Sequence, residues 1–227
     1  MEYSEVIQLL KSKYNSKNVK GLTKAGINPQ NALGIRIPEL RKLAKEIGKN
    51  HKLALKLWDS KIHEARILAS MIDDPEQVSE RQMEVWTKDF NSWDLCDQVC
   101  MNLYKYTDFA WDKAKEWTER KEEFVKRAGF ALMATLAVGN KDIKNNKYLQ
   151  YTKVIKQGST DDRNFVKKAV NWAIRQIGKR NIGLNKEMIK LAKEIQTLDS
   201  KAAKWIAKDA IKELQSKKIQ ARLKKKK

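Results

Sequence analysis

Apolar positions along this chain recur at the three- and four-residue spacing of amphipathic helices, whereas the two-residue alternation of half-buried strands is hard to find. Signals for helix starts recur as well, because Pro38 suits a first helical turn and Ser79 with Gln82 has the form of a capping box. Further N-caps are expected at Asn91 (with Asp94), Thr160 and Asp199. The pattern predicts an all-α chain of about twelve or thirteen short helices, with no strand.

An internal repeat is visible within this helical pattern. The run from Phe124 to Ala128 (Phe-Val-Lys-Arg-Ala) recurs 41 residues later from Phe165 to Ala169 (Phe-Val-Lys-Lys-Ala). The offset falls within the roughly 40–47 residues of HEAT and armadillo helix pairs, and weaker echoes lie around Arg66 and Lys204. One helix pair cannot bury its apolar face alone, so the repeats predict a curved superhelical solenoid of degenerate HEAT/armadillo-like repeats. We expect it to form a single domain over residues 1–215.

The chain of 227 residues is strongly basic, with 48 Lys and Arg against 28 Asp and Glu and a formal charge of +20. The last twelve residues carry seven of these cations and no acid, so residues 216–227 are expected to be a disordered basic tail. Removing these seven charges from +20 leaves +13 on the remainder. Nucleic acid is the polyanion that commonly relieves such self-repulsion, and a generally lysine-rich proteome is the alternative explanation.

Several classes of protein are disfavoured. No run approaches the roughly 20 apolar residues of a membrane helix, and the first residues lack the order of a signal peptide, so we expect a cytoplasmic protein without membrane contact. Cys96 and Cys100 are too close in sequence to staple distant segments, and neither His51 nor His63 lies at ligand spacing from them. We therefore expect no disulfide and no metal site. Nucleotide hydrolysis and triad-type acyl transfer have no supporting motif.

The predicted helix from Phe165 to Lys179 has two unlike faces. Its apolar face, the core side, consists of Val166, Ala169, Val170, Ala173, Ile174 and Ile177. The opposite face gathers, within about 60° of arc, Lys168, Trp172, Arg175 and Lys179. An indole among cations costs free energy in water unless a partner covers it, and the combination suits a surface that grips phosphates and contacts a base or sugar. The alternative is that Trp172 packs against a neighbouring repeat.

The segment from Ser92 to Tyr104 repeats this pattern with the opposite charge. The core side is expected to hold Leu95, Val99 and Leu103, and the other face Trp93, Asp97, Cys100 and Tyr104. Asp94 suits a helix N-terminus, but Asp97 lies a turn further in, where capping does not explain it. A carboxylate facing DNA would repel phosphates, so in that position it should stabilise a positive charge. The alternative is an ion pair between Asp97 and Arg127 or a neighbouring lysine.

Arg127 is a single cation at the edge of a predicted helix, Glu123 to Val138, that is otherwise apolar almost all round. An arginine fork in such a place can hold a phosphate or a carboxylate. The sequence allows either a phosphate or a carboxylate as the partner of Arg127, and Asp97 is the candidate carboxylate.

Together these segments resemble the AlkD family of DNA alkylation repair glycosylases, which are built from HEAT-like repeats. The resemblance runs from about Tyr3 to Leu214. It is carried by Leu33-Gly34-Ile35-Arg36-Ile37-Pro38-Glu39-Leu40-Arg41, Ser92-Trp93-Asp94-Leu95-Cys96-Asp97, Val125-Lys126-Arg127-Ala128 and Val166-Lys167-Lys168-Ala169-Val170-Asn171-Trp172. The Trp-Asp-x-x-Asp, Arg-Ala and Lys-Ala-x-x-Trp elements, in this order on successive repeats, form a specific signal.

The resemblance implies a monofunctional DNA glycosylase of base excision repair, which hydrolyses the N-glycosidic bond of cationic alkylpurines such as 3-methyladenine and 7-methylguanine. By motif, Trp93 and Trp172 match the aromatic walls of the family's cleft, Asp97 its catalytic carboxylate, and Arg127 its backbone-gripping arginine. The DNA-binding residues are expected to be Arg127, Lys126, Lys168, Arg175, Lys179 and Lys204. We expect a monomer that acts on double-stranded DNA containing alkylated bases, without a metal or organic cofactor.

The sequence departs from the family in two places. A characterised branch has a tyrosine just before the Gly-x-x-x-Pro-Glu element, but the stretch from Gly21 to Asn31 has no aromatic residue, and a Trp-Trp-Asp becomes Ser92-Trp93-Asp94. These departures leave the lesion range open. The main alternative function is a non-catalytic HEAT-like module that binds damaged or branched DNA, and a third is a scaffold whose groove binds a peptide.

Overall fold

The structure, a computed structural model, describes residues 1–139 and 142–225. Over these residues the chain forms fifteen α-helices and two short 3-10 helices, and no strand. The all-α prediction is therefore confirmed, and the count exceeds the expected twelve or thirteen because short elements such as α10 (Asn146–Leu149) form as well. Within the described part of the chain, no helix is long and apolar enough to cross a membrane.

The chain divides into two compact units, Met1–Phe109 and Ala110–Lys227. The single domain over residues 1–215 stays a prediction. In a repeat protein each repeat contacts mainly its neighbours, so few long-range contacts oppose such a division. The first unit contains α1 (Tyr3–Ser12), α2 (Ser16–Lys24), α3 (Ile37–Ile47), α4 (His51–Asp59), α5 (His63–Ile72), α6 (Glu80–Lys88), α7 (Trp93–Asn102) and η1 (Tyr104–Tyr106). The second contains α8 (Ala110–Glu116), η2 (Trp117–Glu119), α9 (Glu123–Leu136), α10, α11 (Thr152–Gly158), α12 (Asn164–Gly178), α13 (Ile182–Gln196), α14 (Lys201–Leu214) and α15 (Lys217–Lys224).

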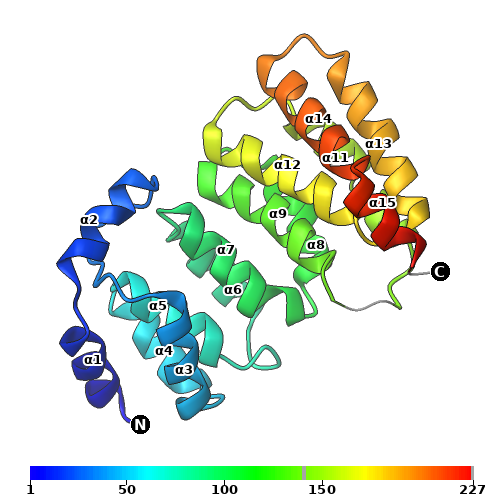
Figure 1. The fold of residues 1–227 in the computed structure, drawn as a ribbon. Coiled ribbons are helices and arrows are strands. Elements are labelled where there is room, and N and C mark those ends of the chain that lie inside the picture. The colour runs from blue at the N-terminus through cyan, green and yellow to red at the C-terminus, as the bar shows by residue number, and fades with distance from the viewer. Residues whose placement is uncertain (140–141, 226–227) are drawn as a thin grey trace. The chain divides into compact units, whose positions relative to one another are not determined.

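The repeated motif places equivalent residues side by side in the second unit. Helices α9 and α12 pack together, and α12 packs in turn against α14 (Figure 1). Phe124 and Phe165, which start the two copies of the motif, have ring centroids 5.5 Å apart. Gly158 of α11 lies so close to Phe130 that an added Cβ would come within 2.3 Å of the ring, so a side chain there would force α11 away from α9. The offset of 41 residues therefore marks stacked helices.

Side chains of one repeat also complete the helix ends of the repeat before it. Arg180 donates from Nη1 to the carbonyl of Ala137 at 2.9 Å, and Arg222 donates from Nη2 to the carbonyl of Lys179 at 3.3 Å. Ala137 and Lys179 are the C-caps of α9 and α12, whose terminal carbonyls have no partner within their own helix. Both hydrogen bonds span 43 residues. The repeat is therefore held by polar contacts of constant spacing as well as by apolar packing.

The first unit is built around two stacked indoles. The rings of Trp58 on α4 and Trp86 on α6 have centroids 4.0 Å apart. The Arg66 guanidinium lies 5.0 Å from the Trp58 ring and forms an ion pair of 3.0 Å with Asp89. Arg66, where the sequence showed a weak echo of the repeat, is thus a buried residue of this core.

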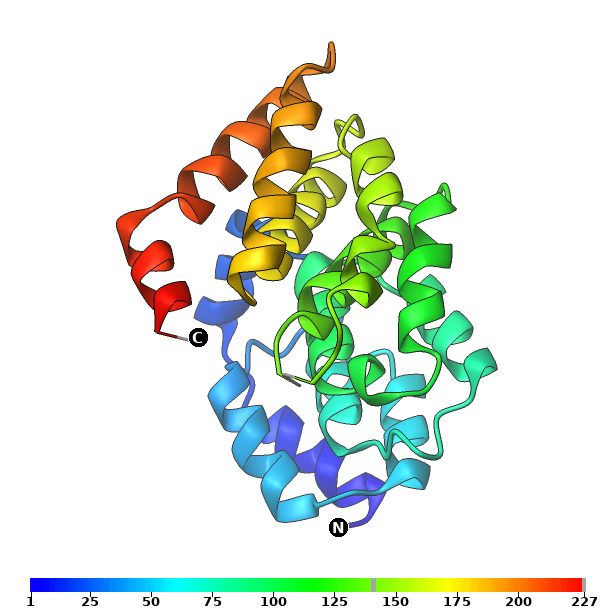
Figure 2. The ribbon, with the colours of Figure 1, turned by 90° about the vertical axis from the view of Figure 1, so that its right-hand side faces the viewer.

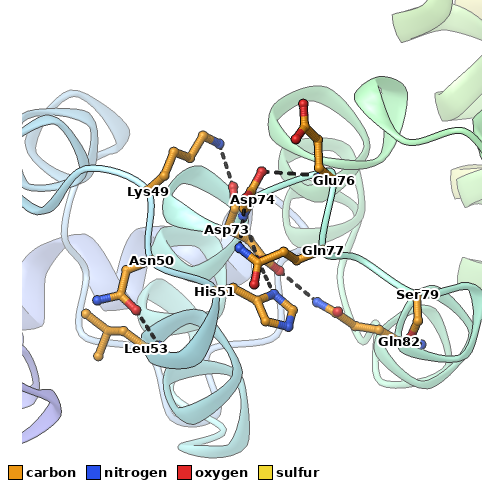
Figure 3. A network of polar contacts seen from close by, with 10 residues as sticks. All are labelled: Lys49, Asn50, His51, Leu53, Asp73, Asp74, Glu76, Gln77, Ser79 and Gln82. Atoms are coloured by element: carbon orange, nitrogen blue, oxygen red, sulfur yellow. Dashed lines mark hydrogen bonds and ion pairs between the residues drawn. The ribbon is translucent and has the colours of Figure 1, made fainter.

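A polar network joins three helices at the far end of α5 (Figure 3). The carboxylate of Asp73, the buried C-cap of α5, lies 2.7 Å from His51 Nδ1 and accepts a hydrogen bond of 2.7 Å from Gln82 Nε2. Lys49 Nζ donates to the Asp73 carbonyl at 2.5 Å. Because these partners come from the start of α4 and from α6, one buried carboxylate fixes how the three helix ends meet.

The expected helix starts were correct in two cases and displaced in three. Pro38 lies in the first turn of α3, and the Ser79 hydroxyl caps α6 by accepting from Gln82 N at 3.1 Å. The N-caps expected at Asn91, Thr160 and Asp199 are instead Ser92, Arg163 and Ser200. Thr160 uses its hydroxyl to donate to the Gln157 carbonyl of the preceding helix, so it ends α11 and does not start α12.

The disordered tail expected for residues 216–227 is wrong over α15. Ser216 caps this helix, and Ile219 and Leu223, one turn apart, are both buried. The Gln220 amide also donates to the Leu214 carbonyl at the end of α14, at 2.7 Å. The prediction rested on the number of lysines and did not consider Ile219 and Leu223, whose burial packs this short helix against the protein. Residues 226 and 227 lie outside the described part of the chain.

Candidate nucleic-acid interface

Trp93 and Asp97 lie one turn apart on α7, and both side chains are partly exposed. The helix buries Leu95, Cys96, Val99 and Cys100. The Trp93 indole nitrogen donates to the carbonyl of Ala25, the C-cap of α2, at 3.0 Å. This hydrogen bond restricts the orientation of the indole and ties the end of α2 to the start of α7. An aromatic group and a carboxylate therefore share one side of a helix whose start is anchored.

A buried histidine holds the first turn of α7. His63 Nε2 lies 2.8 Å from Asp94 Oδ2, and His63 is 5% exposed. Burial acts to lower the pKa of His63, but the hydrogen bond and charge of Asp94 outweigh it and raise that pKa. Burial acts to raise the pKa of Asp94, and the hydrogen bond and charge of His63 lower it overall. Each partner thus stabilises the charged form of the other, and α5 is linked to the helix that carries Trp93.

The neighbouring residue, Glu64, organises the loop that contains Leu33, Gly34 and Ile35. Its buried carboxylate accepts hydrogen bonds from the backbone N–H groups of Leu33, Gly34 and Ile35 at 2.7, 2.6 and 3.2 Å. Gly34 has a φ of +75°, and a Cβ there would lie 2.5 Å from the Asn15 carbonyl. Both the conformation and the close approach therefore require glycine. The Leu-Gly-Ile sequence is a carboxylate-binding turn within the fold.

Two of the four residues expected on the outer face of α7 are not there. Cys100 and Tyr104 are both fully buried. The helix ends at Asn102, and Leu103 has φ −126° and ψ −66°, so Tyr104 begins a 3-10 helix and leaves the α-helical register. Its ring packs against Phe90, with centroids 6.3 Å apart. The outer face is consequently narrower than the helical wheel predicted, and it retains Trp93 and Asp97.

The predicted basic face of α12 is present in position but is partly neutralised. Lys168 is exposed and Trp172 is partly exposed, whereas Arg175 and Lys179 reach across to α14. Arg175 Nη1 and Lys179 Nζ bind the two carboxylate oxygens of Glu213 at 2.5 and 2.6 Å. Partial burial acts to raise the pKa of Glu213, but the hydrogen bonds from Lys179 and Arg175 lower it overall. Glu213 is a residue that the sequence reasoning did not consider.

Arg127 is a buried residue in the packing between α9 and α12. It is 5% exposed, and its Nη1 donates to the Phe165 carbonyl at 2.6 Å, which joins α9 to the start of α12. The adjacent Lys126 lies 3.5 Å from the Asp161 carboxylate, measured from Nζ to Oδ2. The packing between successive repeats gives the Arg127 guanidinium a backbone carbonyl to bind, and its contact with a DNA phosphate stays a prediction.

The solvent face of α14 carries a basic surface larger than the sequence analysis predicted. We had expected only Lys204 here, and its side chain is 58% exposed, with Nζ 3.3 Å from the Asp199 carboxylate. At 100° per residue, exposed side chains fall within about 100° of one another opposite the buried alanines of this helix. They are Lys201, Lys204, Trp205, Lys208 and Lys212, which we call the α14 stripe. Their spacing of three, four, seven and eleven residues was the sequence signal that could have identified them.

Lysines missed by the sequence analysis also lie on α2. Lys17, Lys20 and Lys24 are exposed, and their spacing of three and four residues places them on one side of this helix. The helix contains no acidic residue. Because Ala25 at its end accepts the hydrogen bond from Trp93, these cations belong to the same supported segment as the indole.

The predicted site residues fall into two groups, one in each unit. Trp93 and Asp97 belong to the first unit. The second unit holds Trp172, Arg127, Lys126, Lys168, Arg175, Lys179 and Lys204. Within the second unit, α12 packs against both α13 and α14, which lie side by side in Figure 2.

An open hollow in the second unit lies apart from the predicted residues. An open hollow of about 650 Å³ lies on the second unit, and none of the predicted residues lines it. Its lining residues are Lys156, Lys186, Ile189, Lys190, Lys193, Glu194 and Thr197. Among residues 1–139 and 142–225, no three His, Cys, Asp or Glu side chains are grouped closely enough to hold a metal ion.

Comparison with known proteins identifies relatives of the whole chain. The sequence profile of a family described as "DNA alkylation repair enzyme" matches residues 6–214. A solved structure of a new family related to the HEAT-like repeat DNA glycosylases, with affinity for branched DNA structures, has a TM-score of 0.80 at 20% identity, covering 98% of this chain and 96% of that one. A designed armadillo repeat protein has a TM-score of 0.39 at 16% identity, covering 77% of this chain and 91% of that one, and adds no argument. No curated protein matches. The HEAT-like repeat prediction is thus confirmed.

Proposed function

Because this chain belongs to the DNA alkylation repair enzyme family, we propose that it is a monofunctional DNA glycosylase. Its substrates are cationic alkylated purines, such as 3-methyladenine and 7-methylguanine, in duplex DNA. The observation that carries the proposal is the supported pair on α7, where Trp93 and Asp97 share one side of a helix whose first turn is anchored by hydrogen bonds to α2 and α5. A carboxylate that faces DNA repels phosphates, so in this proposal Asp97 stabilises a positive charge on the substrate.

The chemistry follows from the charge of the lesion. Alkylation at N3 or N7 makes the purine cationic, so it leaves as a neutral base without protonation by the enzyme. Departure breaks the bond between the sugar C1′ and the base nitrogen, and both electrons stay with the base. The sugar acquires oxocarbenium character, which the Asp97 carboxylate stabilises electrostatically. Water then bonds to C1′ and its proton passes to Asp97 or solvent. The reaction is a hydrolysis that needs no electron acceptor.

The two indoles have a separate part in this proposal. In the first unit Trp93 contacts the electron-poor sugar of the lesion, where cation–π attraction contributes about 0.5–2 kcal/mol depending on desolvation. In the second unit Trp172 is proposed, separately, as an aromatic contact to DNA. Partial exposure favours this role, because a fully buried indole cannot contact a ligand and a fully exposed indole is not held in one orientation. The hydrogen bond from Trp93 to Ala25 supplies orientation at that position.

The cations supply affinity for the duplex. The α14 stripe, the α2 lysines and Lys168 are exposed and bind phosphates without reading sequence. Arg127, Lys126, Arg175 and Lys179 are held by protein partners, so in this proposal they set the shape and charge of the surface around the exposed lysines. Affinity should consequently fall steeply with salt and vary little with sequence.

The test is release of methylpurines from methylated duplex DNA by the wild type, by Asp97→Asn and by a control, Asp162→Asn. The control removes an exposed aspartate of the second unit. We expect release by the wild type and by Asp162→Asn, and a loss of about 100-fold or more in Asp97→Asn, as for other preorganised electrostatic groups. Release at the wild-type rate by Asp97→Asn would remove the proposed mechanism.

A second function, a non-catalytic module for damaged or branched DNA, is favoured by one observation. The solved structure with the same fold belongs to a protein with affinity for branched DNA, and the exposed cations here suit that role as well. The same assay separates the two functions when binding is measured beside it. If neither the wild type nor Asp97→Asn releases a base while both bind DNA, the binding module is correct. Negligible binding of DNA that does not depend on salt would instead favour the third function, a scaffold that binds a peptide.

A further inference from the structure

Trp205 is an exposed indole in the middle of the α14 stripe. The residue is 43% exposed, although burial of a tryptophan side chain is strongly favourable. The adjacent residues on the other side of the helix, Ile206 and Ala207, are fully buried, so the helix itself is well packed. The Lys167 ammonium of α12 lies 5.2 Å from the centroid of the ring. The indole is therefore held by a neighbouring helix while much of its surface faces solvent.

The charges around this indole favour an anionic ligand. Lys201, Lys204 and Lys208 lie within one turn of Trp205 on the solvent face of α14. Three acids also lie near: Asp199 pairs with Lys204, and Asp209 and Glu213 pair with Arg175 on the side of the helix toward α12. Asp209 and Glu213 thus face cations of α12, and the solvent face of α14 stays basic.

We propose that Trp205 is a stacking platform for an unpaired nucleobase, with Lys201, Lys204 and Lys208 binding the phosphates on either side of it. An exposed aromatic ring within a run of cations is the arrangement that proteins use to bind single-stranded nucleic acid. In an intact duplex both faces of each base are already stacked, so the indole selects a strand without a partner. In the proposed function the α14 stripe contacts the duplex through its lysines alone, and this inference does not depend on glycosylase activity.

The test compares two labelled oligonucleotides that differ only in their bases. One is a 12-mer of thymidine and the other is a 12-mer of the same charge in which the central residues are abasic. Dissociation constants are measured by fluorescence anisotropy for the wild type and Trp205→Leu, which keeps an apolar side chain but removes the ring. We expect the wild type to bind the thymidine strand at least about fivefold more tightly than the abasic strand, and Trp205→Leu to lose that preference.

Two further variants separate stacking from general effects. Tyr106→Leu removes another exposed aromatic, 62% exposed and with the Lys105 ammonium 4.7 Å from its ring, that lies outside the α14 stripe. It should leave the preference unchanged. Lys204→Gln with Lys208→Gln should weaken binding of both strands equally and reduce the salt dependence. Thermal unfolding checks that each variant is folded.

Two outcomes would overturn the proposal. Equal affinity of the wild type for the thymidine and abasic strands would show that no base is stacked. An equal loss of affinity for both strands in a folded Trp205→Leu would show that the indole acts through packing alone. Neither assay contains an alkylated base, so a failure here is distinguishable from a failure of the glycosylase proposal.

Discussion

Carboxylates have different parts in the two units of the molecule. In the first unit Glu64 and Asp94 bind backbone N–H groups and a histidine in the interior, so they determine where loops and helices lie. In the second unit Glu213 and Asp209 bind Arg175 and Lys179 on a partly exposed surface. Breaking a buried pair of this kind costs several kcal/mol, whereas an exposed pair contributes about 0–1 kcal/mol. The comparison teaches that burial, and not residue type, decides whether an acid shapes the fold or adjusts the surface charge.

The largest expected effect is the loss of the buried Glu64 carboxylate. Glu64→Gln removes the negative charge and one of the two acceptor oxygens that bind the 33–35 turn. Because buried N–H groups are then left without good partners, we expect the free energy of unfolding to fall by about 2–3 kcal/mol. Urea denaturation measures this fall. The control Glu46→Gln changes an exposed glutamate on α3 and should be neutral. An equal effect of the two substitutions would contradict a special role for Glu64.

The His63–Asp94 pair should give an intermediate effect that depends on pH. The folded-state pKa of His63 is raised above its ordinary value of 6.5, so its contribution is complete below that pH and is lost as the pH rises through the folded pKa. The folded-state pKa of Asp94 is lowered from 3.8, so its contribution is complete above that pH and is lost in acid. The pair therefore stabilises the first unit most between about pH 4 and 6.5.

His63→Gln tests this window through thermal unfolding at a series of pH values. We expect a destabilisation of about 1–2 kcal/mol near pH 5–6 that shrinks above the folded pKa of His63. His51→Gln is the control, since His51 also contacts a buried aspartate but lies away from α7. A destabilisation by His63→Gln that does not change with pH would show that packing, and not charge, is what His63 contributes.

The smallest effect, and one of opposite sign, is expected from Glu213. Glu213→Gln removes the carboxylate that Arg175 shares with Lys179, leaves Asp209 beside Arg175, and makes the surface more positive by one charge. We expect duplex DNA to bind about two- to fivefold more tightly, with a steeper salt dependence. Fluorescence anisotropy at two salt concentrations measures both quantities. Glu187→Gln, on the exposed side of α13, should change them less. Unchanged affinity in Glu213→Gln would mean that this part of α12 does not approach DNA.

Much of the fold was predictable because it depends on local patterns. The repeat at residues 124 and 165 predicted helices that pack side by side, and Leu95, Val99 and Leu103 are buried as expected. The same reasoning failed at Tyr104, where a helix end changes the register, and at Ile219 and Leu223, where two apolar residues outweigh seven cations. A helical wheel assumes that the helix continues, which is wrong at Tyr104. A count of charges does not register a short apolar pattern such as Ile219 and Leu223.

The candidate site was predictable only in part. Trp93 and Asp97 stand out by residue type, but nothing in the sequence indicates that Ala25 binds the indole or that His63 reaches Asp94, because these partners are 68 and 31 residues away. Likewise, nothing in the sequence indicates that Arg175 and Lys179 bind Glu213. This residue lies 38 positions after Arg175 and 34 positions after Lys179.

The order of amino acids was sufficient to establish helices, their repetition, the excess of positive charge and the family. Which polar groups are occupied by protein partners and which face solvent was decided only when the repeats stacked, because a side chain's hydrogen bonds and burial depend on neighbours that are distant along the chain. For this reason Arg127 lies within the packing of α9 and α12, while Trp205 and its lysines are exposed.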